Sequence, residues 1–135
     1  MIMRFTKTAI FLGMALLFFA VLIGAFGAHV LQGTLEKNNR VEVFNTANNY
    51  HFYHAFALIV LGFVNHLYEK LVLRRTMLFC FFIGLIIFSG SLYLLAILNT
   101  NWLGAITPIG GSLLLIGWAM LAYNVCVHSL INNQE

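Results

Sequence analysis

Three long stretches of this sequence contain no charged residue, and they limit the folds that the chain can adopt. They cover residues 8–35, 43–68 and 76–134, which are 28, 26 and 59 residues long. A helix needs about 20 apolar residues to cross a bilayer. The first two stretches therefore fit one transmembrane helix each. The third fits two, divided by the polar triplet Asn99-Thr100-Asn101.

The composition excludes a soluble protein. Only 8% of the 135 residues are charged and 61% are hydrophobic, whereas about 25% of residues are charged in an ordinary soluble domain. A chain this short has most of its residues near its surface and would need charge there. Disordered and nucleic-acid-binding classes are excluded for the same reason. We predict one all-α membrane domain over residues 1–135, an antiparallel bundle of four helices at about 8–31, 50–68, 76–98 and 102–126.

The positive residues predict the orientation of these helices. With four spans, five of them flank the helices on the side of both termini: Arg4, Lys7, Lys70, Arg74 and Arg75. Only Lys37 and Arg40 lie on the other side. Short segments rich in Lys and Arg face the cytoplasm, so we expect both termini to be cytoplasmic. Cys80 and Cys126 then lie at cytoplasmic helix ends, where thiols stay reduced.

The outer loop, residues 32–49, carries a helix signal of its own. Asn39 followed by Glu42 is similar to a capping box that opens a helix. Apolar residues then recur at helical spacing, at Val41, Phe44 and Ala47. We therefore expect a short amphipathic helix at the outer interface that runs into the second span. The first span exceeds the roughly 7–15-residue core of a signal peptide, so we expect it to be retained.

Small residues predict where the helices pack, because helices in lipid associate through close backbone approach. The expected packing positions are Ala20, Gly24, Ala28, Gly90, Gly110 and Gly111. Pro108 lies about six residues inside the predicted fourth span. Since proline lacks an N–H, it would free the carbonyl of Gly104, and we expect a kink there.

Uncharged polar side chains gather in the outer half of the predicted helices. The candidate cluster is His29, Tyr50, His54, Ser89, Ser91, Tyr93, Thr107 and Pro108. His29 and His54 each lie within about 6 Å of the outer end of their predicted spans, which allows the two imidazoles to be neighbours. His51 is assigned to an interfacial aromatic belt, and His66 and His128 to the cytoplasmic interface.

Three interpretations of this cluster are open. The favoured one is a hydrogen-bond network that fixes helix register and holds the outer loop. The second is a shallow pocket for a lipid head group, a quinone or a small solute. The third is a metal or haem site through His29 and His54, since two facing histidines can ligate haem. No Cys or carboxylate joins them, so a zinc site lacks ligands. We expect no metal and no cofactor.

The absent residue types limit the function. The chain contains no Asp, and no predicted span contains Glu, Lys or Arg. Ion-coupled transport generally needs an ionisable group in the membrane, and no catalytic motif is present. We expect a non-enzymatic accessory or interaction protein. Its partners would be the lipid bilayer and other membrane proteins or copies of itself, not nucleic acid. The alternative is a binder of a lipid, quinone or haem at the polar cluster, and a small transporter ranks below it.

Several sequence blocks, in order along the chain, resemble a known family. They are Gly24-Ala-Phe-Gly-Ala-His29, then Phe44, Thr46, Ala47, Tyr50, His54 and Ala55, then Ser89-Gly-Ser-Leu-Tyr93, Leu103-Gly-Ala-Ile-Thr-Pro-Ile-Gly-Gly111 and Gly117-Trp118. These blocks resemble the YgdD-like small inner-membrane proteins, a domain of unknown function. The resemblance implies a four-span protein of bacterial inner membranes. It implies no activity.

Overall fold

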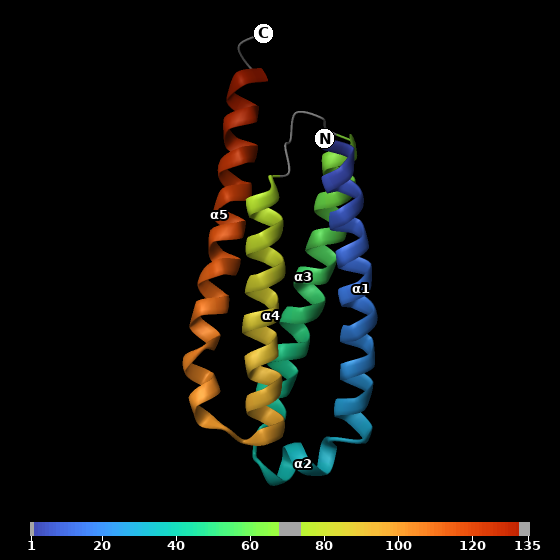
Figure 1. Cartoon of the computed structure of the whole chain (residues 1–135), viewed down its shortest axis with the longest axis vertical. Coiled ribbons are helices and arrows are strands. Elements are labelled where there is room, and N and C mark those ends of the chain that lie inside the picture. The colour runs from blue at the N-terminus through green and yellow to red at the C-terminus, as the bar shows by residue number, and fades with distance from the viewer. Residues whose placement is uncertain (1, 68–73, 133–135) are drawn as a thin grey trace.

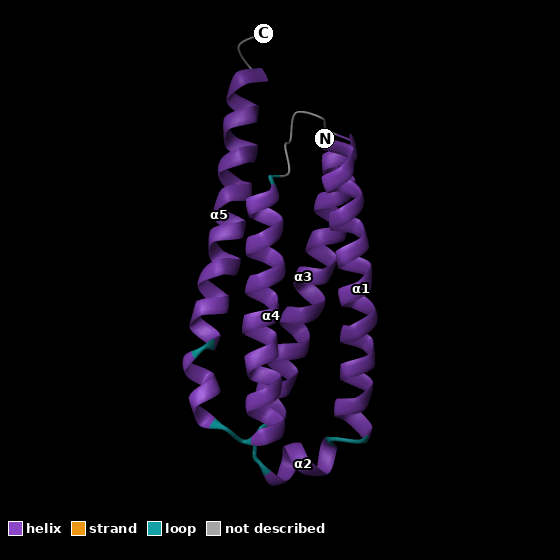
Figure 2. Ribbon diagram, viewed as in Figure 1, coloured by secondary structure: helices purple, strands orange, loops and turns teal. Residues whose placement is uncertain are grey.

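The computed structural model describes residues 2–67 and 74–132, with side chains placed for 6–67 and 74–127. The helices are α1 (Ile2–His29), α2 (Gln32–Lys37), α3 (Val41–Leu67), α4 (Arg75–Leu98) and α5 (Thr107–Asn132), with the 3₁₀ helix η1 (Asn101–Ala105). Figure 2 shows only helices and loops in the described part of the chain. The predicted all-α class is confirmed. Lys70, Glu135 and the side chains of Arg4 and His128 lie outside the description.

The long helices form an open row. In Figure 1 the chain runs down α1, through α2 at the lower end, up α3, down α4 and up α5. α1 packs along α3, α3 along α4, and α4 along α5, while α1 and α5 lie at opposite edges. A compact bundle would bring α1 against α5, so that expectation is corrected. The small residues that allow close approach lie between consecutive long helices. Contacts between consecutive helices alone are sufficient to form a row.

Three helical segments in the described residues are long and apolar enough to cross a membrane. They are Thr6–His29, Arg75–Leu98 and Asn101–Val127. The predicted span 50–68 lies within α3 as far as Leu67, but α3 is not among the three. Its first half contains many polar residues, including Asn45, Asn48, Asn49, His51 and His54.

The predicted capping box is wrong. Asn39 has φ of 55°, a left-handed conformation, and therefore ends α2 rather than capping the next helix. Its N–H donates to the Glu36 carbonyl, and the N–H of Arg40 donates to the Leu35 carbonyl, the two bonds of a Schellman motif. The expected amphipathic segment thus corresponds to the first turns of α3, and α2 was not predicted as a separate helix.

The helix is interrupted near Pro108, but as a junction between two helices rather than as the predicted kink within one. Residues 102–126 do not form one helix, because η1 ends at Ala105 and α5 begins at Thr107. Pro108 is the second residue of α5, where its missing N–H would have had no helical partner in any case. The Thr107 hydroxyl donates to the Leu103 carbonyl at 3.4 Å and adds a side-chain bond to this junction.

Glycines allow two close helix contacts. A Cβ atom at Gly110 would clash with the backbone nitrogen of Phe88 and lie 2.8 Å from the Gly84 carbonyl oxygen, so α4 and α5 meet backbone to backbone. A Cβ atom at Gly13 would lie 2.8 Å from the carbonyl oxygen of Ala55, where α1 meets α3. Such contacts are the kind that small residues make possible between membrane helices.

The six expected packing positions differ in their surroundings. Ala20 is fully buried, and a Cβ atom at Gly24 would lie 2.8 Å from Nδ2 of Asn48. Ala28 is exposed and Gly90 has nothing within 4 Å of an added Cβ atom, so neither lies in a close helix contact. These two expectations are corrected. At Gly111 an added Cβ atom would make only ordinary contact with the Phe88 ring.

Candidate functional site

A buried hydrogen-bonded chain joins α3 to α4. The Tyr93 hydroxyl donates to Oδ1 of Asn48 at 2.9 Å, and Nδ1 of His51 lies 3.3 Å from the Tyr93 oxygen. Because the phenol has only one proton and gives it to Asn48, the proton between Tyr93 and His51 must come from Nδ1. Neutral His51 therefore carries its proton on Nδ1, and its Nε2 presents a lone pair. Asn48 and His51 are three residues apart on α3 and share a face.

His54 lies on another face of α3. Its Nδ1 donates to the Tyr50 carbonyl at 2.9 Å, and its Nε2 accepts the Trp118 indole N–H at 3.2 Å. A carbonyl can only accept and an indole can only donate, so these bonds fix the Nδ1–H tautomer. The ring also stacks on Tyr50, with centroids 5.9 Å apart. His54 thereby links α3 to α5, and both of its nitrogens are engaged.

The expected proximity of His29 and His54 is wrong. His29 is the last residue of α1 and is exposed, whereas His54 is buried. Since α3 begins at Val41 rather than near residue 50, His54 lies about 20 Å along its helix. The described residues contain no group of three His, Cys, Asp or Glu that could hold a metal ion. The arrangement therefore does not supply facing imidazoles for haem.

The other predicted residues lie in separate places. The hydroxyls of Ser91 and Thr107 are 2.8 Å apart and join α4 to the start of α5. Pro108 is exposed beside them. Ser89 is 2% exposed, and its hydroxyl oxygen has no hydrogen-bond partner within the described part of the chain. The eight residues are thus spread over several helix contacts rather than gathered in one cluster, and no side-chain hydrogen bond to His29, Ser89 or Pro108 occurs among the described residues.

Sequence reasoning missed further polar contacts. Asn48, His51 and Trp118 belong to the networks above. A signal for the first two was available in their helical spacing, because positions 48, 51 and 55 recur on one face. Another missed contact lies near the opposite ends of α1 and α3, where the Asn65 amide donates to the Thr6 hydroxyl at 2.7 Å. This buried pair is a polar contact outside the predicted outer-half cluster.

Side-chain hydrogen bonds join the segment after α2 to the C-terminal end of α4. The Asn38 side chain donates to the carbonyls of Ala96 and Ile97 at 3.0 and 3.1 Å, in the last turn of α4. Arg40 donates to the side chains of Asn99 and Asn101. Carbonyls at the end of a helix lack helical partners, so Asn38 stabilises this terminus while Arg40 fixes the loop beyond it.

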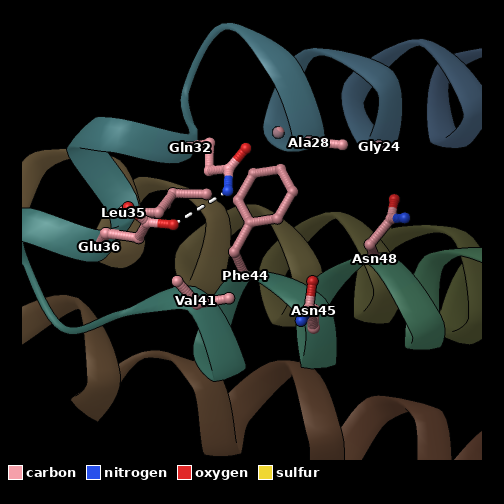
Figure 3. Close-up of a pocket in the computed structure, with 10 residues that line it drawn as sticks. Gly24, Ala28, Gln32, Leu35, Glu36, Val41, Phe44, Asn45 and Asn48 are labelled. Atoms are coloured by element: carbon pink, nitrogen blue, oxygen red, sulfur yellow. Dashed lines mark hydrogen bonds between the residues drawn. The ribbon is translucent and has the colours of Figure 1, made fainter.

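A pocket of about 280 Å³ lies between α1, α2 and α3 (Figure 3). Gly24 and Ala28 line one side, and the Phe44 ring projects between the helices. Gln32 and Glu36 are hydrogen-bonded to each other at 3.0 Å on the α2 side. Its polar groups are mostly uncharged, with Glu36 as the single carboxylate in its lining. This lining suits a small polar group better than a metal ion.

The second relevant cavity, of about 160 Å³, lies between α1, α3 and α4. Its lining is almost entirely apolar, yet it includes His51 and Ser89, each with a buried polar atom that lacks a partner among the described residues.

Comparison with known proteins assigns the chain to a family. The family described as "Protein of unknown function (DUF423)" matches residues 23–111. The chain belongs to this family. The matched range runs from the end of α1 into the start of α5 and includes the contacts among Asn48, His51 and Tyr93, whereas Trp118 and Thr6 lie outside it. No solved structure matches the chain.

Relatives of this DUF423 protein are named as membrane proteins. The "UPF0382 membrane protein YwdK" of Bacillus subtilis is 39% identical over 85% of this chain and 93% of the relative. A "UPF0382 membrane protein" of Staphylococcus haemolyticus is 43% identical over 85% and 92%, and one of Haemophilus influenzae is 41% identical over 78% and 83%. Together with the three candidate spans, these names identify a membrane protein of an uncharacterised family.

Proposed function

We propose that the protein crosses a bacterial inner membrane four times and that α3 is the additional span. Residues 50–67 of α3 number 18, which is about 27 Å of helix and close to the apolar thickness of a bilayer. His51 and His54 lower the mean hydropathy of this segment, but both are buried against other helices. The exposed side chains of the same segment are mainly apolar or aromatic, and include Tyr53, Phe56, Val60, Phe63 and Leu67.

Reporter fusions test this topology. A reporter joined after Lys37 should read periplasmic, and reporters joined after Leu67 and after Glu135 should read cytoplasmic. The Leu67 fusion contains α3 and the Lys37 fusion does not, so a change of reading between them shows that α3 crosses the membrane. The same reading at both sites would contradict four spans, and a periplasmic reading at Glu135 would contradict cytoplasmic termini.

Within the membrane we propose a non-enzymatic accessory role, as a subunit that associates with other membrane proteins or with copies of itself. The observation that supports this role is that the row is open at both edges. The edge helices α1 and α5 expose large side chains that are apolar or aromatic, including Phe11, Phe18, Leu115 and Tyr123. The polar side chains of the interior, by contrast, mostly bond to one another. The resemblance to the YgdD-like small inner-membrane proteins supports the inner-membrane location and implies no activity.

Site-specific photo-cross-linking in cells tests the accessory role. A cross-linking residue replaces Phe18 or Leu115, which are 66% and 71% exposed on the two edges. The control replaces Ile86, which is 51% exposed on α4 in the middle of the row. We expect a discrete protein adduct from at least one edge position and none from Ile86. Lipid adducts alone at both edges, with a single chain in native mass spectrometry, would contradict the proposal.

A further inference from the structure

The cavity between α1, α3 and α4 is lined by apolar side chains together with two buried polar residues, His51 and Ser89. Its walls come from three helices and consist of Ile23, His51, Leu85, Ile86, Ser89, Gly90 and Tyr93. Ile86 is 51% exposed, whereas His51 and Ser89 are 6% and 2% exposed. The cavity therefore passes from a partly exposed apolar side to a buried polar side. A molecule dissolved in lipid would enter past Ile86 and meet His51 and Ser89 last.

The polar side of the cavity holds hydrogen-bonding capacity that no described residue uses. Nε2 of His51 and Oγ of Ser89 are both buried without a partner in the described structure. Buried polar atoms are usually paired, and leaving them unpaired is costly. The bond from Nδ1 of His51 to Tyr93 leaves Nε2 as an acceptor. The Ser89 hydroxyl can donate or accept after rotation about its side-chain bond.

The size of the cavity restricts what it can hold. Its volume is about 160 Å³, and a cavity of about 150 Å³ in another protein accommodates one benzene molecule. One six-membered ring therefore fits, and a longer tail must extend into the lipid. Gly90 contributes to this room, because nothing lies within 4 Å of where its Cβ atom would be.

We propose that this cavity binds the hydroxylated ring of a membrane-dissolved phenol, with the ring hydroxyl donating to Nε2 of His51. A phenol combines the two properties that the lining demands, an apolar ring and a hydroxyl that can donate to a neutral imidazole. Ser89 supplies a second polar contact on the same side. This site is separate from the edges of the row and does not depend on the accessory role.

Binding can be measured with a matched pair of probes, 4-pentylphenol and pentylbenzene, on the full chain purified in detergent. The two differ only in the hydroxyl group. Because one added hydrogen bond is involved, we expect saturable binding of the phenol that is about fivefold tighter than that of pentylbenzene. Calorimetric titration and the ligand-dependent rise in Tm give the comparison at one fixed detergent concentration.

Variants at the cavity separate this site from dissolution in the detergent. Gly90→Leu fills the cavity from a position with free space, so we expect an unchanged Tm without probe and loss of phenol binding. Ser89→Ala removes a hydroxyl that has no partner, so the empty protein should be at least as stable and the phenol should bind more weakly. Ser112→Ala, exposed on α5, is the control and should bind as the unchanged chain does.

Three results would overturn the proposal. They are equal affinity for the two probes, absence of saturable phenol binding, and phenol binding by Gly90→Leu that matches the unchanged chain. If Gly90→Leu does not fold, the comparison of Ser89→Ala with Ser112→Ala decides: equal phenol affinity in those two variants and in the unchanged chain also overturns it.

Discussion

At the residue scale, the buried Tyr93 hydroxyl of α4 contacts two side chains of α3. It bonds to Asn48 on one side and to His51 on the other. Tyr93→Phe keeps the ring and removes both bonds, leaving the buried His51 and the half-buried Asn48 without this partner. We expect the free energy of unfolding to fall by about 1–2 kcal/mol, measured by denaturant titration in mixed micelles.

The control for Tyr93 is Tyr53→Phe, because Tyr53 is 62% exposed and should tolerate loss of its hydroxyl without a measurable change. Equal stability of the two variants would show that the buried chain of hydrogen bonds contributes little. Lower stability in Tyr53→Phe alone would contradict the burial on which the comparison rests.

Sequence reasoning at this scale selected residues better than it placed them. Tyr93, His54 and Ser91 were assigned to a polar cluster favoured to form a hydrogen-bond network, and each is buried and hydrogen-bonded. His54 was expected near the outer end of its span but lies about 20 Å along α3, and the face that a residue presents depends on which helices become neighbours. For this reason the partners Asn48 and Trp118 were missed, and His29 was grouped with residues that it does not reach.

At the element scale, two adjacent glycines of α5 provide a matched test of helix packing. A Cβ atom at Gly110 would clash with the α4 backbone, whereas one at Gly111 would lie 3.5 Å from the Phe88 ring, an ordinary contact. Gly110→Ala should therefore lower the free energy of unfolding by about 1–3 kcal/mol. Gly111→Ala should be neutral or stabilising by up to about 1 kcal/mol, since alanine favours the helix.

The measurement for this pair is the same denaturant titration, with both variants in one detergent. The result that contradicts the contact is Gly110→Ala at least as stable as Gly111→Ala. Because the two positions share local sequence and depth, helix propensity alone cannot produce the expected difference.

The end of α2 offers a second test at this scale. Asn39 adopts a left-handed conformation, which glycine tolerates and which a side chain branched at Cβ does not. Asn39→Gly should leave the Tm within a few degrees of the unchanged chain. Asn39→Val should cost about 1–2 kcal/mol. A Tm for Asn39→Val equal to that of Asn39→Gly would contradict the observed ending of α2.

Helix positions were largely predictable from the charge-free stretches, while helix ends were not. The predicted span 76–98 matches α4 to within one residue, because Arg74 and Arg75 precede the apolar run and Asn99 follows it. The predicted span 8–31 lies along α1 but begins six residues after the start of that helix at Ile2. The errors at Asn39 and Pro108 have a common physical origin. Asparagine caps either end of a helix, and proline either begins a helix or kinks it, so tertiary contacts decide between the outcomes.

At the scale of the whole molecule, the sequence predicted that the helices associate. It did not predict whether the first and last long helices contact each other. Small residues occur on several helix faces. When each helix packs against the next one in the chain, the result can be either a closed bundle or an open row. In the structure, Gly13 lies against α3, and Gly84 and Gly110 bring α4 and α5 together. No contact of this kind joins the described residues of α1 and α5, so the row stays open.

The orientation of the whole molecule should depend on a few positive residues. Five of them are expected on the cytoplasmic side and two on the other. Replacing Lys70, Arg74 and Arg75 with Gln leaves two on each side and removes the bias that orients short loops. We therefore expect a reporter at Glu135 to change from a cytoplasmic reading to a mixed one. Glu36→Gln with Glu42→Gln is the control and should change nothing, because acidic residues contribute little to orientation. A fully cytoplasmic reading from the triple variant would show that helix packing, rather than loop charge, sets the orientation.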